Sequence, residues 1–328
     1  MNTPVFITGA TGYIGSQLAL SLAKKGCDVS VLVRNPSSKK LPKHKAIRVF
    51  QGDILDIDSI QEASKGCRYT FHMAAFTDLT NDHFDPYYDI NVNGTANVLE
   101  ASKINGIKKF IFTSSVSVLG PSKPEVPLTE SQPRITSFAN DYEITKFMAE
   151  ELVKKYSENG LPGVTLNVSR VYGPGPKGFT NGINQLISMA LEKRRIWIPD
   201  RLKQVANYVY IEDVIEAHLL AMEKGVPGEK YIIGGENASY ATLFRTIKRT
   251  NHNRNKYVEL NYNLIKAGIG IKSFLEKMVL GKHGITPKVL DHIYTDRRVS
   301  TKKAQSQLGY HITPLGEGIE RTFAYLKH

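Results

Sequence analysis

Residues 8–15 read Thr-Gly-Ala-Thr-Gly-Tyr-Ile-Gly, and this stretch decides the fold. Residues 4–7 before it are apolar and typical of a strand, and the segment after it carries apolar side chains at helical spacing. Gly9, Gly12 and Gly15 therefore stand in a strand–turn–helix context. Because the N-terminus of a helix offers unpaired N–H groups and the positive end of a dipole, this stretch predicts a phosphate-binding turn.

Each glycine of this turn has an expected role in a dinucleotide site. Gly9 permits the tight turn, Gly12 lets the backbone approach a pyrophosphate, and Gly15 lets the helix pack close to the strand. The spacing is G-x-x-G-x-x-G rather than G-x-G-x-x-G, and this variant narrows the class of dinucleotide-binding protein.

Apolar runs and helical patterns alternate through the first half of the chain. This alternation predicts right-handed βαβ crossovers and an α/β fold with a Rossmann-type, doubly wound parallel sheet. The expected strands are 4–8, 28–33, 46–50, 69–73, 108–113 and 164–169, and the longest expected helices are 86–104 and 138–158.

The pattern changes after the Gly-Pro-Gly-Pro stretch at 173–176, where a helix and short extended pieces follow. We expect an NADP-binding Rossmann domain at 1–170, to which 205–235 returns. A smaller, mostly helical substrate-binding lobe is expected at 171–328, interwoven with the first domain rather than joined to it by a hinge.

Composition excludes several classes of function. The chain has 328 residues with a net charge of +12, but its basic residues are scattered and form no aromatic-interleaved stripe, so no nucleic-acid partner is expected. The charge instead suits an anionic cofactor or substrate. With no bilayer-length apolar run and only two cysteines, Cys27 and Cys67, the sequence predicts a cytoplasmic protein with reduced thiols and no metal site.

The ends of the second, third and fourth expected strands carry candidate cofactor contacts. Arg34 stands where an acidic residue would receive the ribose hydroxyl of NAD, and its guanidinium suits the 2′-phosphate of NADP. NADP(H) is therefore favoured as cofactor, and NAD(H) stays possible. Asp53 is placed to accept a hydrogen bond from the adenine amine, and the small Ala74 and Ala75 leave room for the cofactor. His72 is expected to be a buried, hydrogen-bonded histidine rather than a base.

The fifth expected strand ends in Thr-Ser-Ser at 113–115, and its hydroxyls are expected to face the same edge of the sheet. Tyr142 and Lys146 follow, four residues apart on one face of a helix. A phenol with an ordinary pKa of about 10 is a poor acid–base catalyst at neutral pH. An adjacent ammonium favours the phenolate, so Lys146 is expected to lower the pKa of Tyr142.

Taken in order, eight motifs resemble those of extended short-chain dehydrogenase/reductases, in the NAD-dependent epimerase/dehydratase superfamily. They are Thr-Gly-Ala-Thr-Gly-Tyr-Ile-Gly at 8–15, Gly52-Asp53, His-Met-Ala-Ala at 72–75, Asn-Val-Asn-Gly-Thr at 91–95, Thr-Ser-Ser at 113–115, Tyr142-x-x-x-Lys146, Arg-Val-Tyr-Gly-Pro-Gly at 170–175 and Tyr-Ile-Glu-Asp-Val at 210–214.

This resemblance implies a role for each catalytic candidate. Ser115 is the catalytic serine, Tyr142 the acid–base, Lys146 the ribose-binding lysine, and Asn91 supports a proton-relay water. The expected cofactor-binding residues are Gly9, Thr11, Gly12, Tyr13, Ile14, Arg34, Asp53, Ile54, Ala74, Ala75, Tyr142 and Lys146.

Substrate class depends on finer features. Residues 233–237 and 298–309 are similar to dihydroflavonol-4-reductase-like proteins and to relatives that act as sugar epimerases. The nucleotide-sugar branch usually has an arginine, which holds the diphosphate, where this chain has Ala206, although Arg201 or Lys203 could substitute. We therefore favour an NADPH-dependent reductase of a partly apolar ketone or aldehyde. The alternatives are an NDP-sugar epimerase or dehydratase with tightly bound NAD(P), and a non-catalytic, redox-sensing NADP-binding module.

Three further expectations concern the surface and the second lobe. Residues 264–280 form an amphipathic helix that suits a lid, a wall for a lipophilic substrate, or contact with a membrane surface. The helices at 86–104 and 138–158 commonly form a dimer contact in the resembling family, so a homodimer is expected. The single tryptophan, Trp197, is expected in the core.

Overall fold

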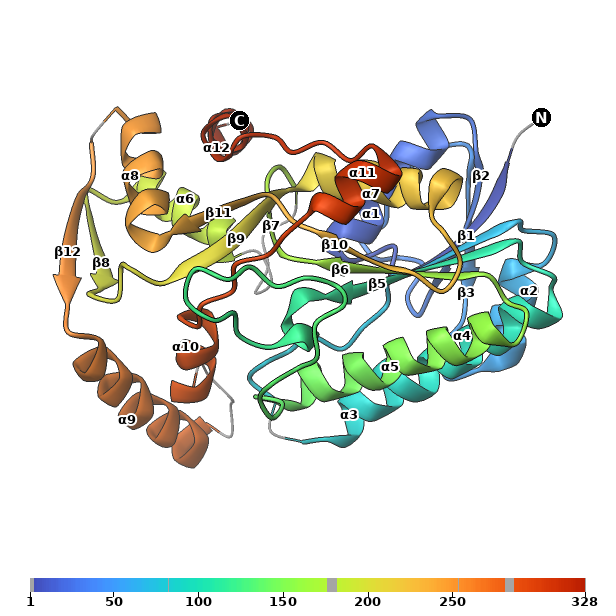
Figure 1. Ribbon diagram of the computed structural model, residues 1–328, viewed down its shortest axis with the longest axis horizontal. Coiled ribbons are helices and arrows are strands. Elements are labelled where there is room, and N and C mark those ends of the chain that lie inside the picture. Colours follow the sequence, from blue (N-terminus) through green and yellow to red (C-terminus); the bar gives the residue numbers. More distant parts are fainter. Residues whose placement is uncertain (1–2, 82, 176–181, 253, 281–285, 328) are drawn as a thin grey trace.

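The computed structural model describes residues 3–81, 83–175, 182–252, 254–280 and 286–327 (Figure 1). Seven parallel strands form the main sheet, in the order β10-β6-β5-β4-β1-β2-β3. The strand order reverses between β1 and β4, so the predicted Rossmann-type α/β sheet is confirmed. Its strands are β1 (Pro4–Thr8), β2 (Asp28–Val33), β3 (Ile47–Gln51), β4 (Tyr69–His72), β5 (Lys109–Ser115), β6 (Gly163–Val168) and β10 (Lys230–Ile233).

Helices cover both faces of this sheet (Figure 1). On one face, Leu18 and Val214 pack against inward side chains of β1 and β2 in the larger core. On the other face, Ile60, Val98 and Val153 surround Phe6, Phe110 and Phe112. The first face carries α1 (Tyr13–Lys24) and α7 (Ile211–Lys224), and the second carries α2 (Ile57–Ser64), α4 (Gly94–Ile104) and α5 (Asp141–Glu158).

The two long helices begin differently from the sequence expectation. The expected helix 138–158 begins only at Asp141, because the Asn140 side chain caps it by accepting a hydrogen bond from the Glu143 N–H at 2.9 Å. The expected helix 86–104 is divided into α3 (Asp85–Tyr88), a π-helical turn η1 (Asp89–Asn93) and α4. A π-turn rotates the following residues and is frequent at functional sites.

The C-terminal lobe is mixed rather than mostly helical. One small sheet joins β7 (Arg170–Tyr172), β9 (Val205–Tyr210) and β11 (Glu236–Ser239), and another pairs β8 (Arg195–Pro199) with β12 (Lys256–Leu260). Of the segment 205–235, α7 and β10 pack with the main sheet, whereas β9 belongs to the small one. The remaining elements are a short 3-10 turn η2 (Val116–Leu119), α6 (Gly182–Glu192), α8 (Tyr240–Thr250), α9 (Tyr262–Leu280), α10 (Pro287–Ile293), α11 (Lys302–Leu308) and α12 (Leu315–Lys327).

Trp197 lies on the surface, so the expectation that it fills the core is wrong. It belongs to β8, where Ile196 and Ile198 point inward and are each 2% exposed. Successive side chains of a strand point to opposite faces, so Trp197 points outward and is 59% exposed.

Candidate active site

The glycine turn between β1 and α1 has the geometry that its sequence predicts. Gly9 has a positive φ of 75°, and a Cβ there would lie 2.6 Å from the Ala74 nitrogen. A Cβ on Gly15 would lie 2.2 Å from the Gly9 carbonyl oxygen, so the helix could not pack as closely with any other residue. Gly12 is exposed and caps α1 without a side-chain hydrogen bond or an acidic residue in the first turn. The first N–H groups of α1 are therefore suited to an anion.

Tyr13 and Ile14 use their side chains for packing rather than for the turn surface. The Tyr13 hydroxyl donates to the Gly173 carbonyl at 2.8 Å, and a Cβ on Gly175 would lie 2.4 Å from the Tyr13 ring. Ile14 packs on the larger core, and Thr11 stays partly exposed. Cofactor contact at Tyr13 and Ile14 would therefore come from their backbone.

Arg34 and Asp53 lie side by side at the carboxyl edge of β2 and β3. The Gly52 N–H donates to the Val33 carbonyl at 3.1 Å, which fixes the two strand ends together. The Arg34 side chain is exposed. One Asp53 carboxylate oxygen accepts from the Leu55 N–H at 3.0 Å.

The end of β4 approaches the glycine turn through backbone groups. The Thr8 hydroxyl accepts from the N–H groups of Met73 and Ala74, both at 3.2 Å. Ala74 and Ala75 are half-buried, as a backbone wall beside a bound dinucleotide would be. Ile54 lies deeper, packed in the second core where a Cβ on Gly94 would touch its side chain at 2.6 Å.

His72 is a buried structural residue, as predicted. Its Nδ1 lies 2.7 Å from the Thr8 hydroxyl and its Nε2 lies 2.9 Å from the Thr95 hydroxyl. Burial and the nearby charge of Lys146 lower the pKa of His72 to about 3, so the imidazole is neutral.

Ser115 and Tyr142 meet at the end of β5. The Ser115 oxygen accepts hydrogen bonds from the Ser117 N–H at 3.2 Å and from the Ser117 hydroxyl at 3.0 Å. Burial raises the pKa of Tyr142 to about 12, while the Ser115 side chain acts in the opposite direction and Glu143 and Glu150 add to the rise. The expectation that Lys146 lowers this pKa is therefore wrong: burial raises it, and the phenol stays protonated at neutral pH.

The pKa of Lys146 is shifted further from its ordinary value than the pKa of Tyr142. It is almost fully buried, its ammonium donates to the Thr113 carbonyl at 2.8 Å, and it lies 4.0 Å from the Phe112 ring centroid. Burial lowers the pKa of Lys146 to about 7, and Glu150 partly opposes this. Since the amine is held by Thr113 and Phe112, its position is set before any ribose arrives.

Asn91 lies in the π-helical turn and ties three segments together. Its side-chain oxygen accepts from the Phe76 N–H at 2.8 Å, and its amide donates to the Phe76 carbonyl and to the Thr145 hydroxyl at 3.2 and 3.1 Å. Its backbone carbonyl accepts from the Thr95 hydroxyl at 2.6 Å. The structure thus places Asn91 against α5, one residue from Lys146, with both side-chain ends occupied.

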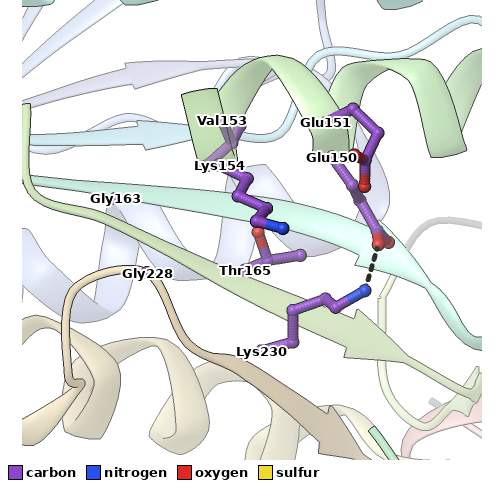
Figure 2. Close-up of a pocket in the computed structure, with 8 residues that line it drawn as sticks. All are labelled: Glu150, Glu151, Val153, Lys154, Gly163, Thr165, Gly228 and Lys230. Carbon is purple, nitrogen blue, oxygen red and sulfur yellow. Dashed lines mark hydrogen bonds and ion pairs between the residues drawn. The ribbon is translucent and has the colours of Figure 1, made fainter. Parts of the chain in front are cut away.

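Behind the catalytic strand lies Glu150, which sequence reasoning did not single out. Its carboxylate accepts from the Ser114 hydroxyl at 2.5 Å and from the Asn167 amide at 2.6 Å, and pairs with Lys230 at 3.5 Å. Figure 2 shows the Glu150–Lys230 ion pair at a pocket lined by residues of α5, β6 and the segment that leads into β10. Burial raises the pKa of Glu150. The contacts with Ser114 and Asn167 tie Glu150 to the ends of β5 and β6.

A second buried carboxylate, Glu143, stands one residue after Tyr142 and gathers basic side chains. It is 0% exposed and pairs with Arg134 at 2.6 Å and with Arg297 at 2.8 Å. His292 lies 3.4 Å from the same carboxylate. No sequence pattern announces this cluster, because Arg297 is 154 residues away from Glu143 along the chain and the members share no motif.

Three features bear on the substrate class: the position of Ala206, the contact of Arg201 and the surface of α9. Ala206 is fully buried in β9, and the Arg201 guanidinium lies 3.8 Å from the Tyr262 ring centroid. On α9, Ile265 and Ile269 pack on the core, whereas Leu264 is 72% exposed. The described part of α9 therefore packs one apolar face on the core, and it also exposes the apolar side chain of Leu264 on its outer face.

Two classes of site find no support in the described residues. Across these ranges, no three His, Cys, Asp or Glu side chains gather closely enough to hold a metal ion. Within the same part of the chain, no helix combines the length and apolarity that a bilayer crossing requires.

Comparison with known proteins places this geometry in context. The model of the "NAD dependent epimerase/dehydratase family" matches residues 5–234. The chain is 25% identical to "Sterol demethylase protein B" of Methylococcus capsulatus, over 92% of each chain. It is 30% identical to "UDP-N-acetyl-alpha-D-glucosaminuronate decarboxylase" of Bacillus cytotoxicus, over 81% of this chain and 85% of the relative.

A third relative and a solved structure are also named for different reactions. "Putative dihydroflavonol 4-reductase" of Synechocystis is 30% identical over 71% of this chain and 68% of its own. The crystal structure of UDP-glucuronic acid 4-epimerase from Bacillus cereus, in complex with UDP-glucuronic acid and NAD, superposes with a TM-score of 0.79. It is 25% identical and covers 99% of each chain. The dihydroflavonol-reductase branch is thus one of several to which the chain is similar.

Proposed function

The chain belongs to the NAD dependent epimerase/dehydratase family, and from this premise we propose that it is an NADPH-dependent reductase of a partly apolar ketone or aldehyde. Family membership makes it an NAD(P)-dependent enzyme of the oxidoreductase and epimerase kind. The proposal adds the cofactor preference, the reaction direction and the substrate class.

The residues present fit a dinucleotide. Gly9 and Gly15 close the turn where a Cβ would collide with backbone, and Gly12 leaves the start of α1 open to phosphate. Arg34 lies exposed beside Asp53, where a 2′-phosphate can be paired by a guanidinium. When bound, the nicotinamide supplies a hydride to the carbonyl carbon.

The side chains at the end of β5 complete the proposed reduction. Tyr142 donates its phenolic proton to the carbonyl oxygen as that oxygen gains charge, and Ser115 donates a hydrogen bond that fixes the same oxygen. Lys146 binds the ribose through its ammonium form, which a pKa of about 7 leaves only partly populated at neutral pH. The observation that carries the proposal is geometric: Tyr142 shares a side-chain hydrogen bond with Ser115, and the Lys146 ammonium is held 2.8 Å from the Thr113 carbonyl of the same strand.

An apolar substrate is supported by two observations. Relatives at 25–30% identity carry names that refer to sterols and to dihydroflavonols. Ala206 stands where the nucleotide-sugar branch usually has its clamp, and Arg201 is engaged with Tyr262. A diphosphate that loses hydration needs an opposing guanidinium, whereas a ketone can bind by burial of apolar surface alone.

An NDP-sugar epimerase or dehydratase is the second candidate, because the decarboxylase relative and the epimerase structure are named for UDP-sugar substrates. In that reaction the same groups run an internal oxidation and reduction, and the cofactor stays bound. A screen of NADPH oxidation against ketones, aldehydes and nucleotide sugars decides between the two. Calorimetry with UDP on the NADP-loaded protein adds a second test, since low-micromolar binding, on the order of −8 kcal/mol, would favour the epimerase.

A non-catalytic, redox-sensing module is the third candidate. The complete Ser115, Tyr142 and Lys146 set argues against it. Retained NADP binding with no turnover on any compound of the screen would argue for it. We also propose a homodimer through α4 and α5, to be tested by sedimentation of the purified protein.

A further inference from the structure

The two-stranded sheet of the C-terminal lobe brings together basic side chains that lie far apart in the sequence. Residues 193–199, which include β8, contain three basic side chains and no acidic one, and residues 240–258 contain five basic side chains and no acidic one. β8 pairs in parallel with β12, and Figure 1 shows this pair at one end of the molecule. The fold therefore gathers positive charge that is scattered along the chain.

Backbone contacts hold the two basic segments together. The buried Asn255 side chain donates to the carbonyls of Ala190 and Lys193, both at 2.7 Å. The Lys256 N–H donates to the Arg194 carbonyl at 2.8 Å. The positions of these basic residues relative to one another are therefore set by the fold itself.

The gathered charges have no acidic partners nearby. Arg195 and Lys256 are register partners, both are exposed, and like charges side by side on a sheet repel each other. Among the residues that the structure describes, no ion pair joins a carboxylate to the side chains of Lys193, Arg194, Arg195, Arg254 or Lys256. Such a surface favours an anionic partner.

The outward side chains of the two strands change from basic to apolar along the strand direction. After the basic pair comes the pair Trp197–Val258, and after it the pair Pro199–Leu260. Trp197 is 59% exposed and Leu260 is 38% exposed. Leu264, in the first turn of α9, extends the exposed apolar side chains beyond β12. We call the outward side chains of Arg195, Trp197, Lys256, Val258 and Leu260 the ribbon surface.

This order of side chains suits the surface of an anionic bilayer. Basic side chains are attracted to anionic head groups, and tryptophan is enriched at the depth of the head groups, where its ring is in apolar contact and its N–H is hydrated. Aliphatic side chains such as Leu260 gain free energy when they leave water for the acyl boundary. A nucleic-acid strand is bound by several aromatic platforms along a basic groove, whereas the ribbon surface has only Trp197.

We propose that the ribbon surface docks on a bilayer that contains anionic lipid. Arg195 and Lys256 contact the lipid phosphates, and Trp197 and Leu260 enter between the head groups. The contact is peripheral, so it requires no helix that crosses the bilayer. The ribbon surface is separate from the catalytic groups at the end of β5, so docking is independent of the proposed reductase and its test needs no substrate.

The single tryptophan makes this docking directly observable. Trp197 is the only tryptophan of the chain, so its fluorescence, excited beyond the tyrosine absorption, reports on the ribbon surface alone. Phosphatidylcholine vesicles in which about a third of the lipid is phosphatidylglycerol should shift the emission to the blue, and brominated acyl chains should quench it. Vesicles of phosphatidylcholine alone should do neither. Salt at about 0.5 M should reverse the shift, because it screens the charges.

Paired substitutions locate the effect. Each basic side chain near an anionic surface contributes about fivefold in affinity, so Arg195→Gln with Lys256→Gln should weaken vesicle binding about twentyfold. Trp197→Ala should weaken it about tenfold, measured by co-sedimentation because the fluorophore is gone. The matched control is Arg68→Gln with Lys108→Gln, which removes the same charge from exposed positions just before β4 and β5 and should bind as the wild type does. Unchanged melting temperatures show that the variants are folded.

Three results would overturn the docking surface. The first is an emission that anionic vesicles leave unchanged at low salt. The second is an equal loss of binding in the ribbon pair and the control pair, because attraction would then depend on net charge and not on this surface. The third is tighter binding to a single-stranded oligonucleotide than to vesicles, with dependence on Arg195 and Lys256, which would assign the surface to nucleic acid.

Discussion

Two neighbouring regions of this protein bury positive charge, and they do so with different side chains. At the end of β5, Lys146 is buried against Thr113 and the Phe112 ring, and its pKa falls to about 7. Beyond the start of α5, Arg297 is equally buried, yet its pKa falls only to about 10. At neutral pH the lysine can release its proton and the arginine cannot.

This difference decides what each region requires from its surroundings. A buried lysine can become neutral, so it can lie among carbonyls and aromatic rings and still serve chemistry. A buried arginine stays charged, so it needs a carboxylate such as Glu143 or an anionic ligand. The following changes test that distinction, from the largest expected effect to the smallest.

The arginine region should be the more sensitive to loss of its carboxylate. Glu143→Gln leaves Arg134 and Arg297 buried without a counter-ion, so we expect the free energy of unfolding to fall by about 3–5 kcal/mol. Urea unfolding followed by circular dichroism measures it. The control is Glu151→Gln, an exposed carboxylate on the same helix, which should change stability by less than about 0.5 kcal/mol. Similar losses in both variants would mean that burial of the charge does not matter here.

Substitutions at Tyr142 and Lys146 should lower the turnover rate more than they lower the free energy of unfolding. Tyr142→Phe keeps a buried ring and removes one hydroxyl, so NADPH affinity should hold while turnover drops by about a hundredfold or more. Lys146→Met should damage both cofactor affinity and rate, because one ammonium serves both. Steady-state kinetics and NADPH titration give the two readouts. A Phe variant that works within about threefold of the wild-type rate would remove Tyr142 from the mechanism.

An exposed arginine provides a third point of comparison. Arg34 can pair with the 2′-phosphate of NADP, a contact that NAD does not offer. Such a charge-assisted hydrogen bond contributes about 1.5–3 kcal/mol, so NADPH should bind roughly ten- to a hundredfold more tightly than NADH. Arg34→Gln should bring the two affinities together in a fluorescence titration. Equal affinities in the wild type would show that Arg34 only contacts solvent.

The smallest expected effect is a shift in pH dependence. If ribose binding needs the ammonium of Lys146, NADPH affinity should be highest below about pH 7 and fall as the pH rises through the pKa of Lys146. Glu150 raises that pKa, so Glu150→Gln should move the midpoint to lower pH, by less than about one unit. Tyr142, with a pKa of about 12, stays protonated and does not contribute. A midpoint that moves to higher pH would contradict this account of Lys146.

The sequence predicted those parts of the fold that depend on local pattern. The strands of the main sheet, the turn at Gly9 and the pairing of Tyr142 with Lys146 on one helix all follow from short-range spacing. The helix starts were less predictable: Asn140 ends the expected extension of α5, and the π-turn at Asp89–Asn93 leaves no clear signature in composition.

What the sequence could not show depends on distant contacts. Trp197 was expected in the core, but the alternation of β8 places its neighbours inward instead. Arg134 comes from a loop and Arg297 from a segment after α10, and only the folded chain brings both to Glu143. The pKa of Tyr142 was expected to fall because Lys146 lies one helical turn away. It rises instead, because the ring is buried, and burial cannot be read from the spacing of a tyrosine and a lysine.

The order of the main sheet has a consequence for how this chain is synthesised. β10 is its outermost strand on one side and pairs with β6 through Lys230–Thr165 to Ile233–Val168. Until residue 233 has emerged from the ribosome, β6 is therefore an edge strand with unpaired backbone groups. Its residues, all buried in the folded chain, lack the cover that β10 provides. A fragment that ends near residue 170 would keep that edge permanently, so it should associate with other copies more readily than the whole chain does.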